Sequence, residues 1–196
     1  MAEPINDPAL DQLYREARTH VAWQDKKVDD ELLKELYELV KWGPTASNIL
    51  PMRLVFVKST AAKERLKPCL AGGNVEKSMS APVTAIIAFD LQFYEKSPRL
   101  WPHSDLRSNF MGKPDEAYTV AFRNGSLQGG YFIIAARALG LDCGPMSGFS
   151  NDKVDAEFFA GTEFKSNFLC NLGYGDASKL HPRGPRLTFE EVCSIL

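Results

Sequence analysis

The most informative stretch of the sequence is Trp42-Gly-Pro-Thr-Ala-Ser-Asn-Ile-Leu-Pro-Met-Arg53, a predicted loop whose polar side chains lie between two prolines. Its hydrogen-bonding side chains are those of Thr45, Ser47 and Asn48. Leucines at helical spacing predict a helix over 32–40 before the loop, and the β-branched and aromatic run at 54–57 predicts a strand after it. A ligand with a polar edge fits such a junction. The same residue types also cap turns, so the loop alone leaves a purely structural role open.

Length, composition and net charge limit the classes of protein to which the chain can belong. A chain of 196 residues with 44% hydrophobic content is expected to form a single domain over 1–196. The net charge of −2 and the lack of any block of five basic residues argue against nucleic acid or a membrane surface as a partner. The longest apolar run, 83–89, is too short to span a bilayer, and the acidic amino terminus has no signal-peptide pattern. We therefore expect a soluble cytoplasmic protein.

The four cysteines indicate neither a disulfide framework nor a metal site. They stand far apart, at Cys69, Cys143, Cys170 and Cys193, with no CxxC pair and no Cys/His cluster at zinc spacing. We expect reduced thiols and no metal.

Periodicity predicts the remaining elements. In order, they are a first helix from Asp7-Pro8 to Ala17, a helix over 61–70, a break at Gly72-Gly73-Asn74, a central strand over 83–89, a long aromatic excursion over 90–117, a helix over 121–141, a helix over 154–159 and a strand over 168–172. The helix at 121–141 is apolar nearly all round, which predicts burial or a subunit interface. Its glycines, Gly125, Gly129 and Gly130, favour the close approach of another helix.

Several common catalytic motifs are missing. The sequence has no GxGxxG fingerprint, no Walker loop, no HExxH and no EF-hand loop. Ser147 lies in Gly-Pro-Met-Ser-Gly, which lacks the spacing of a nucleophile elbow, so nucleophilic catalysis by a serine is disfavoured.

What remains is a set of polar elements in a fixed order. They are Arg18-Thr19-His20, Pro44-Thr45-Ala46-Ser47-Asn48-Ile49-Leu50-Pro51, Pro145-Met146-Ser147-Gly148, and Arg183 with Arg186. Together they resemble the flavin-dependent nitroreductase family over nearly the whole chain. The resemblance implies that the arginine segment after the first helix and the carboxyl-terminal arginines hold the phosphate of FMN. It further implies that the Pro44–Asn48 loop binds the isoalloxazine and that the Pro145–Gly148 turn lies near flavin N5.

The chemistry of these residues suits those roles. A phosphate dianion is matched by guanidinium groups, of which Arg18 and Arg186 supply two. The Asn48 amide carries both a donor and an acceptor, as does the edge of the flavin pyrimidine. Gly148 has no side chain to obstruct an approach to the ring.

Two positions depart from the family pattern. The family often has a second basic residue shortly after the first arginine, where this chain has Val21, so phosphate recognition here depends on His20 or on Arg183 and Arg186. The family's glutamine before the second proline is Leu50 in this chain, which removes one expected contact with the flavin edge.

The sequences of four segments resemble those of one branch of the family, the malonic semialdehyde reductases of uracil degradation. The segments are Ala17-Arg-Thr-His, Trp42-Gly-Pro-Thr, Gly144-Pro-Met-Ser-Gly-Phe and Gly173-Tyr-Gly-Asp. This resemblance implies an oxidoreductase that uses FMN and NADH or NADPH to reduce malonic semialdehyde to 3-hydroxypropionate, with nicotinamide and substrate taking turns at one flavin face. A broad nitroaromatic or quinone reductase and a non-catalytic flavin-binding module are the alternatives.

The aromatic excursion at 90–117 is the predicted roof of the substrate site. His103, Tyr94 and Arg107 are the candidates to donate a proton to the aldehyde oxygen or to pair with the substrate carboxylate. Ordinary packing of a long loop is the other interpretation of these residues.

The resemblance also implies the fold. It is α+β, with a mostly antiparallel central sheet flanked by helices, in an intertwined homodimer that holds one FMN in each of two interface sites. The apolar helix predicted at 121–141 independently calls for burial against another surface.

Overall fold

The computed structural model describes residues 3–196. Four strands form its sheet: β1 (Met52–Val57), β2 (Val83–Asp90), β3 (Asp142–Met146) and β4 (Phe164–Gly173). Their order is β1-β2-β4-β3, and each neighbouring pair is antiparallel. The predicted α+β class with an antiparallel sheet is confirmed.

Helices surround this sheet. They are α1 (Asp7–Leu10), continued by a π-helical turn (Asp11–Arg15), α2 (Asp30–Val40), α3 (Thr60–Leu66), α4 (Gly72–Ser80), α5 (Ser97–Leu100), α6 (Leu106–Phe110), α7 (Pro114–Ala138), α8 (Asn151–Phe158) and α9 (Phe189–Val192). Short 3-10 turns occur at Ala46–Asn48, Lys67–Cys69, Phe93–Lys96 and Ala177–Lys179.

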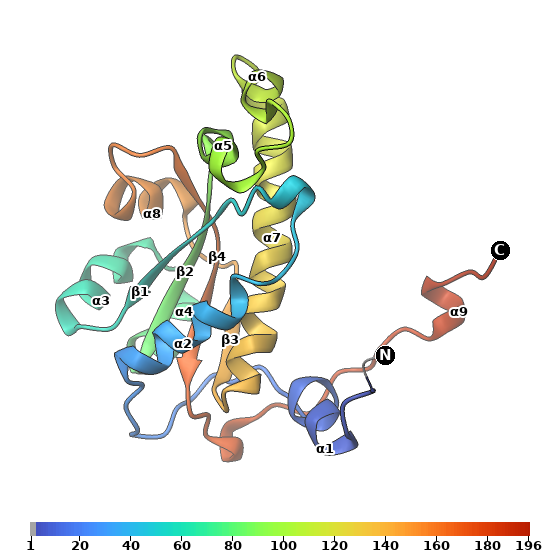
Figure 1. Ribbon diagram of the computed structural model, residues 1–196. Coiled ribbons are helices and arrows are strands. Elements are labelled where there is room, and N and C mark those ends of the chain that lie inside the picture. The colour runs from blue at the N-terminus through green and yellow to red at the C-terminus, as the bar shows by residue number, and fades with distance from the viewer. Residues whose placement is uncertain (1–2) are drawn as a thin grey trace.

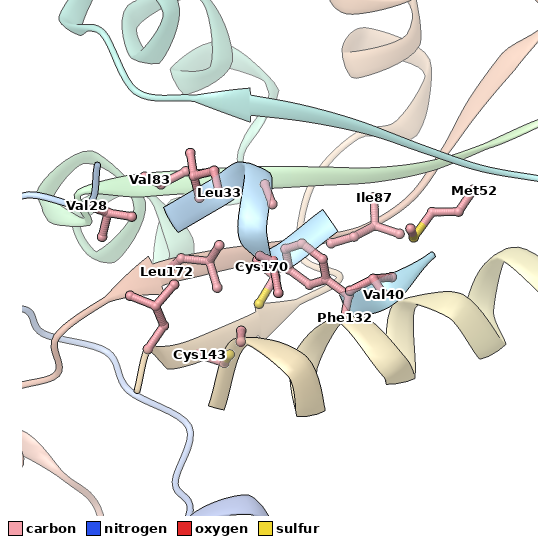
Figure 2. Packing of buried hydrophobic residues seen from close by; sticks show 14 residues of the cluster. Val28, Leu33, Val40, Met52, Val83, Ile87, Phe132, Cys143, Cys170 and Leu172 are labelled. Atoms are coloured by element: carbon pink, nitrogen blue, oxygen red, sulfur yellow. The ribbon is translucent and has the colours of Figure 1, made fainter. Parts of the chain in front are cut away.

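The sheet is the middle of three layers. All eight residues of β2 are buried, as the lack of alternation in its sequence predicts. Ile87 packs in a cluster with α2 and α7, whereas Ile86 packs in a second cluster with α3 and α8. Figure 1 shows α7 on one side of the strands and α3 and α8 on the other. Figure 2 shows Phe132 of α7 directed toward the sheet beside Ile87 and Cys170.

Helix α7 lies unusually close to the sheet because two of its glycines face strands. A Cβ added to Gly125 would lie 2.9 Å from Cβ of Phe89, and one added to Gly129 would lie 2.5 Å from the ring of Phe168. The prediction that these glycines admit another helix is therefore wrong, since they admit β2 and β4. At Gly130 an added Cβ would meet no other atom within 4 Å among the described residues.

Several predicted boundaries need correction. Helix α7 begins at Pro114 rather than at 121, with proline and two acidic residues in its first turn. The predicted break at 72–74 is the first turn of α4. Residues 142–146, predicted in part as a polar loop, form β3 because β4 offers them a partner. The excursion at 90–117 contains the short helices α5 and α6.

Three further findings concern residues 3–196. None of the helices there is both long and apolar enough to cross a membrane. No cluster of three His, Cys, Asp or Glu side chains in this range could hold a metal ion. Cys69, Cys143 and Cys170 are buried free thiols, and Cys193 is an exposed one.

The two adjacent glycines of α7 provide a matched test of the close approach. Gly129→Ala should lower the free energy of unfolding by about 1–3 kcal/mol, because the new methyl group overlaps the Phe168 ring. Gly130→Ala should raise it by about 0.5–1 kcal/mol, because alanine is the better helix former. Urea unfolding of both variants measures the difference. Equal effects would show that α7 does not depend on this contact.

Candidate functional site

An arginine-rich cleft lies at the carboxyl end of α7. Its volume is about 600 Å³, and its walls come from residues 14–21, from α7 and from residues 181–186. Its arginines are Arg15, Arg18, Arg137, Arg183 and Arg186. The structure thus brings together Arg18, Arg183 and Arg186, which the sequence predicted to act on one group.

Backbone contacts hold the walls of this cleft in place. Thr19 forms a parallel bridge with Cys143 of β3, and the His20 N–H donates to the Cys143 carbonyl at 3.0 Å. The Arg18 guanidinium donates to the carbonyl of His181, and Arg183 donates to the carbonyl of Ala17 at 3.2 Å. Hydrogen bonds from arginine side chains to backbone carbonyls therefore join the segment 14–21 to the segment 181–186.

The charge of the cleft is mostly uncompensated. Arg15 pairs with Asp7 at 2.7 Å and with Asp11 at 2.9 Å. Within residues 3–196, the other four arginines have no carboxylate within 4 Å. The Arg137 Nε atom is buried without a hydrogen-bond partner among these residues. Guanidinium donors that converge without counter-charges fit a phosphate dianion.

The side chain of His20 lies outside this cleft. It is buried, and its Nε2 lies 3.3 Å from Oδ1 of Asp142. Its ring packs so closely on Gly175 that a Cβ there would lie 1.8 Å from Nδ1. The sequence predicted a phosphate contact for His20, but packing against Gly175 directs its ring into the protein interior.

The Pro44–Leu50 loop adopts a conformation that is unfavourable for its residue types. Ser47, Asn48 and Leu50 have φ angles of 46°, 51° and 41°, in the left-handed region that suits glycine. Thr45 Oγ1 accepts a hydrogen bond from the Leu50 N–H at 3.2 Å. The Asn48 amide donates to the carbonyl of Leu100 at 3.0 Å. Two of the three polar side chains that the sequence predicted as ligand contacts thus also stabilise the loop and its link to the excursion.

Side chains of α7 contact the loop at two points and the first residue of β1 at a third. Oδ1 of Asn124 accepts from the Ala46 N–H at 2.9 Å, and Oε1 of Gln128 accepts from the Met52 N–H at 2.9 Å. The Tyr131 hydroxyl donates to the Pro44 carbonyl at 3.2 Å. Sequence reasoning missed Asn124 and Gln128, although two amides four residues apart on an otherwise apolar helix were a detectable signal.

The Pro145–Gly148 segment continues from β3. Pro145 and Met146 pair with β4, and Ser147 is exposed just after the strand. The Gly148 carbonyl accepts from Nδ2 of Asn74 at 2.7 Å. A Cβ at Gly148 would lie 2.4 Å from that nitrogen, so a larger residue there would require the Asn74 side chain to move.

The cleft and the Pro44–Leu50 loop do not converge within one copy. The loop is bonded to Asn124 and the cleft contains Arg137. At a rise of about 1.5 Å per residue, these two positions are about 20 Å apart along α7. In Figure 1 the loop lies beside the upper half of α7, and the first helix lies near its lower end.

The excursion places its three candidate residues on or near the surface. The Arg107 Nε atom lies 2.8 Å from Oε2 of Glu95, and this exposed ion pair raises the pKa of Arg107. Tyr94 stacks on Phe110 with ring centroids 6.3 Å apart. His103 is exposed and packs edge-on against Trp101.

Comparison with known proteins identifies the family. A model described as "Nitroreductase family" matches residues 14–174. The chain is 60% identical over 194 residues to a protein of Ralstonia nicotianae with the provisional name NADH dehydrogenase/NAD(P)H nitroreductase, and the match covers 98% of this chain and all of the relative. The chain belongs to the nitroreductase family.

Solved structures of distant nitroreductases share the fold. One from Bacillus subtilis superposes with a TM-score of 0.88 at 22% identity and covers 97% of this chain and all of its own. Another, from Exiguobacterium sibiricum and in complex with FMN, superposes with a TM-score of 0.83 at 15% identity over both full lengths. At such identities these matches support the fold alone.

Membership in the nitroreductase family settles the general chemistry. The protein is an oxidoreductase that uses FMN as cofactor and NADH or NADPH as reductant, as the resemblance in its motifs implied. A non-catalytic flavin-binding module, one of the alternatives, is not favoured by this match. The arginine cleft is consistent with the cofactor, since it offers cations without counter-charges to a phosphate.

The hydrogen bond between α7 and the first residue of β1, directly after the loop, can be tested by comparing two polar residues of α7. Gln128→Leu should lower the free energy of unfolding by about 1–3 kcal/mol, because the buried Met52 N–H loses its acceptor. Thr119→Val, which removes an exposed hydroxyl on the same helix, should change it by less than about 0.5 kcal/mol. Amide exchange at Met52 should accelerate only in the first variant, and unchanged exchange there would contradict the assignment.

Proposed function

We propose that the protein reduces malonic semialdehyde to 3-hydroxypropionate at an FMN site formed between two copies of the chain. The observation that carries the proposed site is the separation of two polar elements along α7. The cleft of one copy and the Pro44–Asn48 loop of the other each supply part of the site. One copy alone holds these parts about 20 Å apart along the helix.

In this arrangement the phosphate lies in the arginine cleft. Arg18, Arg183 and Arg186 supply guanidinium donors, and Thr19 adds a hydroxyl at the cleft wall. Strand β3 then leads toward the flavin ring, because Thr19 is bridged to Cys143 at the start of that strand. At about 3.3 Å per residue, Met146 lies about 10 Å further along the strand.

The ring lies between two loops. Pro145, Met146, Ser147 and Gly148 contact it from the copy that holds the phosphate. Pro44, Thr45, Ser47 and Asn48 contact it from the second copy. The amide of Asn48 is partly committed to Leu100, which leaves its carbonyl oxygen for the pyrimidine edge. Leu50 gives the ring an apolar neighbour in place of the family's glutamine.

Exposed apolar surface supports the homodimer. Tyr118, Phe122 and Leu127 of α7 are each more than 40% exposed. The segment that carries α9 stands away from the sheet in Figure 1, and its apolar residues Leu187, Phe189, Val192 and Ile195 are each more than half exposed. Apolar surface of this extent is typical of an interface, and a second copy with an extending carboxyl-terminal segment would form an intertwined dimer.

The substrate proposal depends on the four segments that resemble malonic semialdehyde reductases. FMN held in this site would supply two-electron, hydride-level redox chemistry, with NADH or NADPH as the source of the hydride and the aldehyde carbonyl as its acceptor. The chain itself must orient the aldehyde acid and protonate its oxygen. His103 or Tyr94 would give the proton, and Arg107 would pair with the carboxylate after leaving Glu95, an exchange that costs little at an exposed ion pair.

A second candidate function keeps the flavin and changes the electron acceptor. The relative from Ralstonia nicotianae is named for nitroreductase activity. The excursion also offers aromatic faces at Tyr94 and Trp101 that suit flat acceptors. Nitroaromatics or quinones would then be the substrates.

The visible spectrum of the purified protein, taken without oxygen, separates these functions. NADH or NADPH should bleach the flavin band, and malonic semialdehyde should restore it. Recovery with a quinone or a nitroaromatic but not with the aldehyde would favour the second candidate. A band that persists after both reductants are added would contradict a reductase of either kind.

The role of Arg107 can be measured through the KM of the aldehyde. Arg107→Ala should raise the KM for malonic semialdehyde about 10-fold, the effect of losing a contact of about 1.4 kcal/mol, and leave the KM of an uncharged quinone unchanged. Arg99→Ala, at an exposed arginine of α5 in the same excursion, serves as the control. An unaltered KM for the aldehyde in Arg107→Ala would remove this residue from the proposal.

A further inference from the structure

One wall of the arginine cleft lacks a basic residue that the family's sequence pattern often has. Val21 stands where related sequences often have a second basic residue, and in the structure it lines the cleft with its apolar side chain. The segment 14–21 therefore gives the cleft only Arg18 as a cation without a carboxylate partner, since Arg15 is paired with Asp7 and Asp11.

A different element brings a guanidinium to the same cleft. Arg137 lies in the last turn of α7, far from Val21 in sequence, and it lines the same cleft as Arg18. Its Nη1 donates to the carbonyl of Leu13 at 2.8 Å, which fixes the direction of the guanidinium. The carbonyl of Arg137 accepts from Nε2 of Gln12 at 2.7 Å, so the backbone at this helix end is also tied to the first segment.

The remaining hydrogen-bonding capacity of Arg137 is unused. Its Nε atom is buried and has no partner among residues 3–196, and none of their carboxylates lies within ion-pair distance of its guanidinium. A buried cationic donor without an acceptor is costly, and such groups are commonly satisfied by a ligand. The planar fork of arginine suits two oxygens of one phosphate.

We propose that Arg137 is a phosphate ligand of the bound FMN and takes the place of the basic residue that this chain lacks at Val21. The inference rests on the proposed function, because it requires the FMN phosphate to lie in this cleft. It adds a residue from α7 to a phosphate-binding cleft whose other walls come from residues 14–21 and 181–186. Helix α7 would then contact the phosphate through Arg137 and support a ring-binding loop through Asn124.

Comparison of FMN with riboflavin isolates the phosphate contact, because riboflavin lacks only the phosphate. With apoprotein and flavin fluorescence as the readout, Arg137→Gln should weaken FMN binding by about 10- to 100-fold, as expected for a lost charged hydrogen bond, and leave riboflavin binding unchanged. Arg137→Lys should recover part of the loss, since it keeps the charge but not the fork. Arg65→Gln, at an exposed arginine of α3 paired with Glu157, controls for the change in net charge.

Three outcomes would overturn the inference. Equal weakening of FMN and riboflavin by Arg137→Gln would show that Arg137 acts through its contact with Leu13 and not through the phosphate. An unchanged affinity for FMN would show that Arg137 does not bind the cofactor, while leaving the rest of the cleft as the phosphate site. Wild-type protein that binds riboflavin as tightly as FMN would instead refute the placement of the phosphate in the cleft, and with it the proposed site.

Discussion

The close approach of α7 to the sheet is the constraint on which the rest of the structure depends. It requires that Gly125 and Gly129 have no side chain, because Phe89 and Phe168 occupy the space that a Cβ would take. With the helix at this distance, Asn124 accepts a hydrogen bond from the loop that precedes β1, and Gln128 on the next turn accepts one from Met52, the first residue of β1. The same placement brings the last turn of α7 to the amino-terminal segment, where Arg137 contacts Leu13. One helix thus sets the positions of both polar elements.

The loop needs this support because its backbone is strained. Ser47, Asn48 and Leu50 have left-handed φ angles without being glycine. Asparagine adopts this region more readily than other residues, whereas Ser47 and Leu50 each cost of order 1 kcal/mol or more. The amide oxygen of buried Asn124 on a rigid helix offsets part of that cost, since releasing the loop would leave it unpaired. A loop held in this way keeps its polar groups in one geometry before any ligand arrives. Preorganisation of this kind reduces the entropy lost on binding.

Sequence patterns predicted the elements whose burial is periodic and missed those that depend on a distant partner. Helix α2 and strand β2 follow directly from their apolar spacing, and the order of four polar motifs led to the right family. Strand β3 was missed because Gly144-Pro145 resembles a turn until β4 pairs with it. The burial of His20 depends on Gly175, and the contribution of Arg137 to the cleft depends on how α7 meets residue 13. Contacts so distant in sequence leave no local signal.

The spacing of the two polar elements along α7 has a thermodynamic consequence for the proposed site. If the flavin bridges the cleft of one copy and the loop of another, each bound cofactor contacts both copies. A ligand that binds the dimer and not the separated copies stabilises the dimer by mass action. By the same linkage, association of the copies raises the affinity for the flavin. The exposed apolar residues of α7 and of the carboxyl-terminal segment would then contribute to cofactor binding without touching the cofactor.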